Sequence, residues 1–450
     1  MLNRFLYKSY RFFYTVNTLI SSRFTGVGRL ILIGIAVSAV IGLDTEKALA
    51  YQIFAFLVSL VSISMIWSLF AKGNFTVIRK LPKFGTVGET LFYIIEIQNT
   101  TLKKQNYLSL IENLTDPRPT IDELVNTPEP DEEKRNIWDR RTLYFRWLWL
   151  ISKNRKAHVK ETPLPNIPPN GKIELRANLL PLQRGELEIT GVNFLYPDPL
   201  GIFKSFINVP VRQSLLILPK QYQINPIDLP GSRKYQPGGV AFASSIGNSD
   251  EFLSVRDYRP GDPLRQIHWK SWAKTGKPII KEYMDEYFVR HALILDTFLN
   301  VAYSNVFEAA VSVAASVIGN IQTQESLIDL MFVGAKAYCF SSGRNTSNTD
   351  KMMEVLASVK ICQDKPFSTL SLPVFEHSSV LSGCIIILLM WDKERQNFIS
   401  HLKKMGLPVF VIVIMENNLT HALDLGPMAD STEKFHIINP NNIKEGLAKL

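Results

Sequence analysis

Cysteine is scarce in this 450-residue chain, and its scarcity excludes several classes of protein. Only Cys339, Cys362 and Cys384 are present, which is too few for a disulfide framework and forms no CxxC metal pair. We therefore expect a reducing compartment. The motifs GxSxG, HExxH and GxxxxGKS are also missing, which leaves no candidate nucleophile, zinc site or phosphate-binding loop. The sequence accordingly predicts a protein that is not an enzyme.

Acidic residues are absent from the first 29 positions, although the chain as a whole has 41 Asp and Glu against 50 Lys and Arg. The basic residues of this arm are Arg4, Lys8, Arg11, Arg23 and Arg29. They supply five of the nine excess positive charges. Because Arg4, Lys8 and Arg11 fall on one face of a helix, we predict either a helix that lies on anionic lipid or a frayed basic tail.

Charges are also absent from two apolar runs, Leu30 to Leu43 and Ala48 to Ala71. A bilayer core needs about 20 apolar residues, so the second run can cross it, and the first can do so only if it extends back beyond Arg29. The short connection between the runs predicts an antiparallel hairpin, unless the first run is the core of a signal peptide. Basic residues on both flanks predict a multi-pass inner (plasma) membrane protein whose soluble domains face the cytoplasm.

Residues 72–221 contain β-rich runs separated by turn residues, and several runs alternate apolar with polar residues. This pattern predicts a β-sandwich with an insertion over residues 115–160. We expect the proline-rich first part of the insertion to be a mobile loop. Its tryptophan-rich second part is predicted either to contact lipid headgroups or to pack on the sandwich as a strand or helix. The predicted strands are 74–81, 89–100, 105–114, 171–181, 185–196 and 213–220.

Residues 222–450 change to alternating strands and helices, which predicts an α/β domain with a mostly parallel sheet covered on both faces. The expected architecture is therefore a membrane-anchored multidomain chain: a basic arm and two transmembrane helices over 1–71, the sandwich over 72–221, and the α/β domain over 222–450. The predicted strands are 291–296, 326–334, 384–392 and 408–415, and the predicted helices are 305–321, 349–360 and 393–406.

The stretch EFLSVRDYRPGDPLRQIHWKSWAKTGKPIIKEY, residues 251–283, concentrates charge and tryptophan before this sheet. It predicts a strand, a turn at Pro260-Gly261, a short helix capped by Asp262 and ended at Gly276, and a returning strand. Alternating Arg and Asp favour an ion-pair network that fixes the turn. A partner-binding surface and a catalytic site remain alternatives.

This stretch resembles the signature of the bacterial family called domain of unknown function 58. The resemblance extends to the two-helix anchor and to QRGELEITGVNFLYPDPLGIFK before the signature, and leaves out only the insertion. The family often has Asp in place of His268, and Ala-Arg in place of Ala273-Lys274. The matching residues are Glu251, Phe252, Arg256, Tyr258, Pro260, Gly261, Asp262, Arg265, Ile267 and Trp269.

The resemblance implies a von Willebrand factor type A-like last domain, in which a metal site follows the first strand as Asp-x-Ser-x-Ser. The chain has Asp296-Thr297-Phe298-Leu299-Asn300 at that place, so both serine positions have changed. Asp392 follows a neighbouring strand, at the carboxyl end where such sheets bind ligands. Asp296 and Asp392 are therefore weak candidates for binding Mg²⁺, and helix capping or loop polarity is the alternative. We expect no other cofactor.

The resulting prediction is a non-catalytic, membrane-anchored cytoplasmic scaffold that engages the lipid bilayer and a protein partner. The sandwich would serve as a spacer or docking module, and the α/β domain would bind its partner near Asp296 and Asp392. By analogy of context, the resemblance implies a partner among MoxR-type AAA ATPases and neighbouring membrane or transglutaminase-like proteins. The alternatives are a divalent-metal-dependent ligand-binding module and a nucleic-acid-binding membrane protein. Nucleic acid is not expected, because acidic residues interrupt the basic signature stretch.

Overall fold

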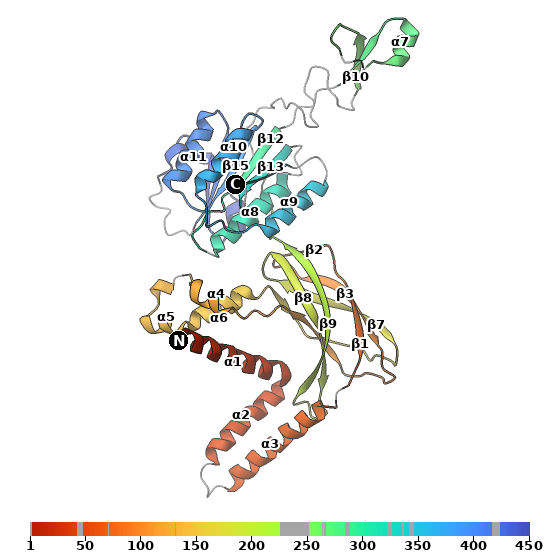
Figure 1. The fold of residues 1–450 in the computed structure, drawn as a ribbon, viewed down its shortest axis with the longest axis vertical. Coiled ribbons are helices and arrows are strands. Elements are labelled where there is room, and N and C mark those ends of the chain that lie inside the picture. The colour runs from red at the N-terminus through yellow and green to blue at the C-terminus, as the bar shows by residue number, and fades with distance from the viewer. Residues whose placement is uncertain are drawn as a thin grey trace. The chain divides into compact units, whose positions relative to one another are not determined.

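A computed structural model describes residues 2–42, 48–70, 72–130, 132–225, 252–262, 264, 267–283, 289–301, 303–321, 326–334, 337–341, 346–415 and 424–450. The chain divides into two compact units, Met1–Leu218 and Pro219–Leu450 (Figure 1). Each unit has its own sheets and its own apolar core. The two units are therefore described in turn.

Three helices open the first unit: α1 (Leu2–Arg23), α2 (Gly26–Ile41) and α3 (Ala48–Ser68). One stretch, Leu49–Ser68, is long and apolar enough to cross a membrane, whereas α2 is apolar but shorter. Leu30 lies on α2 with its side chain exposed, and the predicted run ends Leu43 and Ala71 lie outside the described residues.

Two sheets of the first unit enclose one apolar core (Figure 1). In strands such as β1, every second residue is buried, because alternate side chains of a strand point to opposite faces of the sheet. The buried side chains of the two sheets form the core between them. The first sheet has the order β1 (Phe75–Lys80), β3 (Leu91–Asn99), β7 (Lys172–Pro181), β5 (Ala157–Val159). The second has the order β2 (Phe84–Thr86), β9 (Lys204–Leu218), β8 (Gly185–Pro197), β4 (Ser109–Leu114), β6 (Thr162–Pro163).

A buried ion pair crosses this core and joins the two sheets. Arg79 of β1 donates through Nη2 to Oε2 of Glu112 in β4 over 2.8 Å, and Tyr93 donates its hydroxyl to Oε1 of the same carboxylate over 3.1 Å. Arg79 also donates through Nη1 to the Val211 carbonyl over 2.7 Å. Because both charges are hydrogen-bonded, their burial is tolerated, and loss of either partner would leave the other unpaired.

The first part of the insertion contains two short helices between segments without regular structure, and the prediction of a loop missed these helices. A capping box starts α4: Thr120 accepts from the Glu123 amide, and the Glu123 carboxylate accepts from the Thr120 amide. Glu132 pairs with Arg146 over 2.6 Å, which ties the acidic stretch to the following helix. The helices are α4 (Ile121–Asn126), η1 (Glu132–Lys134), α5 (Ile137–Thr142) and α6 (Tyr144–Asn154).

The second unit contains a six-stranded sheet in which β14 alone of the described strands runs antiparallel to its neighbour. The prediction of a mostly parallel sheet is confirmed, and β14 and β17 are strands that it missed. The order is β14 (Ala337–Ser341), β13 (Ser326–Val333), β12 (Val289–Leu295), β15 (Gly383–Leu388), β16 (Val409–Ile414), β17 (Phe435–Ile438).

Helices cover this sheet, and every residue of β15 and β16 is buried. One face packs against α11 through Phe398, Ile399 and Leu402, while α8 contacts β12, β13, β15 and β16. Continuous apolar runs are typical of strands buried on both faces. The helices are α8 (Asn305–Ile321), α9 (Thr346–Ser358), α10 (Ser371–His377), α11 (Lys393–Lys404) and α12 (Ile443–Leu447).

Candidate functional site

The signature stretch folds as a small antiparallel pair, β10 (Phe252–Asp257) and β11 (Ile279–Tyr283), with the helix α7 (Trp269–Thr275) between the strands. The strand-turn-helix-strand plan is thus confirmed, and the left-handed Gly276 ends the helix as predicted. Phe252 lies opposite Tyr283 in the pair. Glu251 and Arg265 lie outside the described residues.

Asp262 closes the turn of this stretch, and α7 begins after His268; residues 263, 265 and 266, where the predicted cap would act, lie outside the described residues. Arg256 donates through Nη1 and Nη2 to the two Asp262 oxygens over 2.7 and 2.9 Å, and the Arg259 amide donates to the same carboxylate over 2.8 Å. The Arg256 guanidinium and the Arg259 amide together hold the pKa of Asp262 at about 2. Pro260 and Gly261 form the turn, in which Gly261 has φ +104°. The ion pair therefore stays formed at neutral pH.

The remaining signature residues divide between buried and exposed positions. Ile267 is buried and bridges Ile280 of β11, and the amide of Tyr258 donates to the Pro278 carbonyl over 3.0 Å. Trp269 is 64% exposed and stacks on Trp272 with ring centroids 5.2 Å apart. The stretch therefore combines a fixed turn with an exposed aromatic surface, and whether its role is structural or partner-binding stays a prediction.

Asp296 and Asp392 converge at the carboxyl ends of β12 and β15, as predicted, but an arginine lies between them. Arg395 of α11 donates through Nε to Asp296 over 2.6 Å and through Nη1 to Asp392 over 2.6 Å. Its guanidinium also lies over the ring of Phe367, 4.7 Å from the centroid. Burial raises the pKa of Asp296, and Arg395 opposes that rise. Burial disfavours the charged form of Arg395, but its hydrogen bonds to Asp296 and Asp392 outweigh burial and raise its pKa.

These two carboxylates do not fit Mg²⁺, because protein donors already occupy their oxygens. Asp296 is fully buried and accepts from the amides of Phe298 and Leu389 over 3.0 and 3.2 Å in addition to Arg395. Asp392 caps α11 and accepts from the Arg395 amide over 2.9 Å. A hard divalent cation needs several free oxygen ligands, and the guanidinium supplies the positive charge here. No cluster of three metal-ligating side chains occurs among the described residues.

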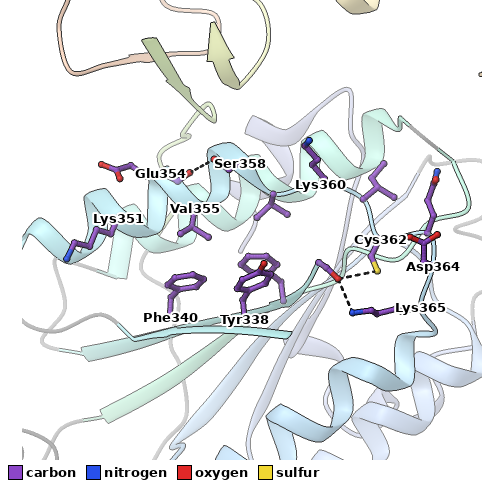
Figure 2. Close-up of a pocket in the computed structure, with 15 residues that line it drawn as sticks. Tyr338, Phe340, Lys351, Glu354, Val355, Ser358, Lys360, Cys362, Asp364 and Lys365 are labelled. Atoms are coloured by element: carbon purple, nitrogen blue, oxygen red, sulfur yellow. Dashed lines mark hydrogen bonds between the residues drawn. The ribbon is translucent and has the colours of Figure 1, made fainter. Parts of the chain in front are cut away.

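A pocket of about 960 Å³ opens beside the edge strand β14, under α9 (Figure 2). Its floor is an aromatic stack in which Tyr338 lies 5.2 Å from Phe332 and 6.0 Å from Phe340, centroid to centroid. Val355 faces the rings from α9 (Figure 2). Polar side chains at the rim are Lys351, Glu354, Ser358, Lys360, Gln363, Asp364 and Lys365.

The pocket adjoins the Asp296 cluster through the loop that follows α9. The amide of Cys362, a lining residue, donates to the Thr297 carbonyl over 2.8 Å. Sequence reasoning missed this site, although the aromatic residues at alternate positions of AYCFS are a signal of a strand with one aromatic face. Lysine and carboxylate side chains around an aromatic floor are suited to binding a mixed apolar and charged segment.

Comparison with known proteins adds a family relationship. A relative, the uncharacterized protein YeaD of Bacillus subtilis (strain 168), is 26% identical over 180 residues, which cover 39% of this chain and 42% of YeaD. The chain thus spans about two fifths of the length of the curated relative it matches.

Two solved structures share a low similarity with the chain. The CARDB domain of the PF1109 protein from Pyrococcus furiosus, solved in complex with di-metal ions, has a TM-score of 0.18 and 13% identity over 33% of this chain and 91% of that one. The PapD-like domain 7 of human CEP192 has a TM-score of 0.17 and 12% identity over 32% of this chain and 84% of that one. At these TM-scores neither similarity carries an argument.

The signature turn and the pocket both lie in the part of the chain that matches a family model. The family model described as "Protein of unknown function DUF58" matches residues 254–372, which include the Arg256–Asp262 ion pair and every residue that lines the pocket. The resemblance predicted from the signature is therefore confirmed. Over residues 254–372 the chain is similar to the DUF58 family of proteins of unknown function.

Proposed function

We propose that this chain is a membrane-anchored adaptor without chemistry of its own, whose second unit binds an extended segment of a cytoplasmic protein. The observation that carries the proposal is the aromatic pocket beside β14. The partner-binding face was predicted near Asp296, but Asp296 is fully buried. We therefore propose that the partner binds in the pocket next to Asp296.

An edge strand beside a concave aromatic site is suited to β-strand addition. Within the described part of the sheet, β14 pairs with β13 on one side only, so its other edge can receive a further strand. Alternate side chains of an added strand would reach the rings of Tyr338 and Phe340, and an acidic side chain would meet Lys351 or Lys360. We therefore expect an extended apolar segment that carries an acidic residue.

The membrane anchor rests on α3, which at 21 residues is about 31 Å long, the thickness of a bilayer core. We propose that α2 crosses the membrane together with α3, and that the soluble parts of the chain face the cytoplasm. In this proposal the two sheets of the first unit form a β-sandwich that acts as a spacer. The second unit is then a von Willebrand factor type A-like domain. The family resemblance makes a MoxR-type AAA ATPase the partner to test first. The membrane anchor and the identity of the partner are separate proposals, and the pocket does not decide either of them.

The test places a photo-crosslinking amino acid at Lys351, on the rim of the pocket, in the full chain in native membranes. We expect a crosslink to a purified MoxR-type AAA ATPase that disappears on Tyr338→Glu, which puts a charge into the aromatic floor. Val301→Glu, at a position that is 46% exposed and outside the pocket, is the matched control and should leave the crosslink unchanged.

Two other outcomes would revise the proposal. A crosslink that persists in Tyr338→Glu would show that the pocket is not the binding site. A different protein that crosslinks from Lys351 and is lost in Tyr338→Glu would retain the adaptor role and remove the MoxR-type ATPase as partner.

A further inference from the structure

Helix α1 has three distinct faces, and the first packs on the helical insertion. Tyr7 and Tyr10 each lie 5.9 Å from the ring of Trp147 in α6. Tyr10 donates its hydroxyl to the Thr142 carbonyl over 2.8 Å, and Tyr7 donates to the Pro119 carbonyl over 3.3 Å. The insertion therefore holds α1 in a fixed rotation about its own axis.

The second face of α1 is apolar and exposed. Phe5, Phe12, Val16 and Leu19 recur at helical spacing, so they share one face. Phe5 and Phe12 are 68% and 64% exposed, whereas side chains of this size are usually buried. In α5 of the insertion, Trp138 is 76% exposed. Exposed apolar groups of this extent mark an interaction surface.

The third face of α1 is basic and lies between the other two. Arg4, Lys8 and Arg11 occupy it, and α1 contains no acidic residue. A helix with neighbouring apolar and basic faces has the pattern of one that lies in the plane of an anionic membrane.

The end of α1 joins the apolar helices through a rigid connection. Thr25 caps α2 by accepting from the Gly28 amide over 3.1 Å, and it donates its hydroxyl to the Gly201 carbonyl over 2.5 Å. A Cβ at Gly28 would lie 2.2 Å from the Ile202 carbonyl oxygen, so only glycine permits this approach. In Figure 1, α4–α6 lie above α1, while α2 and α3 extend below its end.

We infer that α1 lies in the headgroup region of an anionic bilayer with its Phe5 to Leu19 face in lipid, and that α4–α6 are the clamp that holds it in that orientation. This inference rests on the proposed membrane anchor. It assigns to the insertion a role in setting the height and orientation of the soluble part above the bilayer. The exposed Trp138 of α5 is a side chain of the kind that favours the headgroup region.

The test uses single reporter cysteines in the full chain with Cys339→Ser, because Cys339 is the exposed one of the three native cysteines. A fluorophore is attached at Phe12→Cys, on the apolar face, and at Thr18→Cys, an exposed polar position in line with Arg4 and Arg11, about 120° around α1 from Phe12. Ser59→Cys, within α3, reports on the anchor itself. Each protein is reconstituted into vesicles of phosphatidylglycerol and phosphatidylcholine that contain a nitroxide-labelled lipid as quencher.

We expect quenching at positions 59 and 12 and weaker quenching at position 18, because position 18 lies on the side of the basic residues and not in the apolar face. Replacing the basic face by Arg4→Gln, Lys8→Gln and Arg11→Gln should reduce quenching at position 12 to its value in pure phosphatidylcholine. If position 59 is quenched while positions 12 and 18 are equal, the inference fails and the anchor stands. If position 59 is not quenched, the anchor fails and the inference with it. Equal quenching at position 12 in both lipids would overturn the preference for anionic lipid.

Discussion

At the scale of single residues, His291 links the stability of the second unit to pH. Its imidazole is 2% exposed within β12, and both ring nitrogens lack a hydrogen-bond partner among the described residues. Burial lowers its pKa to about 4 from the ordinary 6.5, because the charged form would lose its hydration. The unfolded chain therefore takes up a proton near pH 6.5, and the folded chain near pH 4. The free energy of unfolding should be unaffected above pH 6.5 and should fall by about 3 kcal/mol between pH 6.5 and 4.

The substitution His291→Leu should remove this contribution, because the apolar side chain binds no proton in either state. For the detergent-solubilised full chain, we expect Tm to fall less between pH 7 and pH 4.5 in the variant than in the wild type. His401→Leu, at an exposed position on α11, is the control and should keep the wild-type dependence. Parallel curves for the wild type and His291→Leu would mean that His291 is solvated.

At the scale of elements, the capping box of α4 is the feature that turns a polar stretch into a helix. The substitution Thr120→Ala removes the oxygen that accepts from the Glu123 amide over 3.2 Å. We expect a cost of about 1 kcal/mol, the usual effect of losing an N-cap, so local opening of α4 should become about fivefold more frequent. Hydrogen exchange of the amides of residues 121–126 measures this. Val125→Ala, at an exposed site of the same helix, should leave the exchange nearly unchanged.

The sequence predicts well those helices and strands whose apolar periodicity is sufficient by itself to determine their secondary structure. The helix over 305–321 and the strand over 172–181 follow their apolar patterns nearly residue for residue. The helix α4 in the first part of the insertion was missed because helices of six residues are unstable by themselves and depend on packing, here of Leu124 against the Trp147 cluster. The T-x-x-E capping box was the local signal for α4.

The candidate sites are less predictable, because they combine residues that are distant in the sequence. The convergence of Asp296 and Asp392 followed from parallel-strand topology. The arginine between them did not, since nothing in the sequence indicates that Arg395 points to a residue 99 positions away. Likewise, the pocket forms because β14 pairs antiparallel with β13 and places Tyr338 under α9. The sequence signal for β14 is weak.

At the scale of the whole molecule, the contact between α1 and the insertion constrains the membrane topology. α1 precedes α2 and α3 in the sequence, whereas α4–α6 follow them. If α3 alone crossed the bilayer, α1 and the insertion would lie on opposite sides and Tyr7 could not contact Trp147. The contact is therefore compatible only with an even number of crossings. The described part of α2 is about 24 Å long, which is shorter than a bilayer core of roughly 30 Å.

The topology predicts a specific pattern of labelling by a membrane-impermeant maleimide in the Cys339→Ser background. Thr45→Cys, which lies outside the described residues between α2 and α3, should react in intact spheroplasts. Thr18→Cys and Val301→Cys should react only after lysis, because both should lie on the cytoplasmic side. Reaction of Thr18→Cys in intact spheroplasts would indicate a single crossing and separate α1 from the insertion. Reaction of Val301→Cys in intact spheroplasts would place the second unit outside the cell and exclude a cytoplasmic partner. The three positions together therefore distinguish a hairpin anchor, a single span and a reversed orientation.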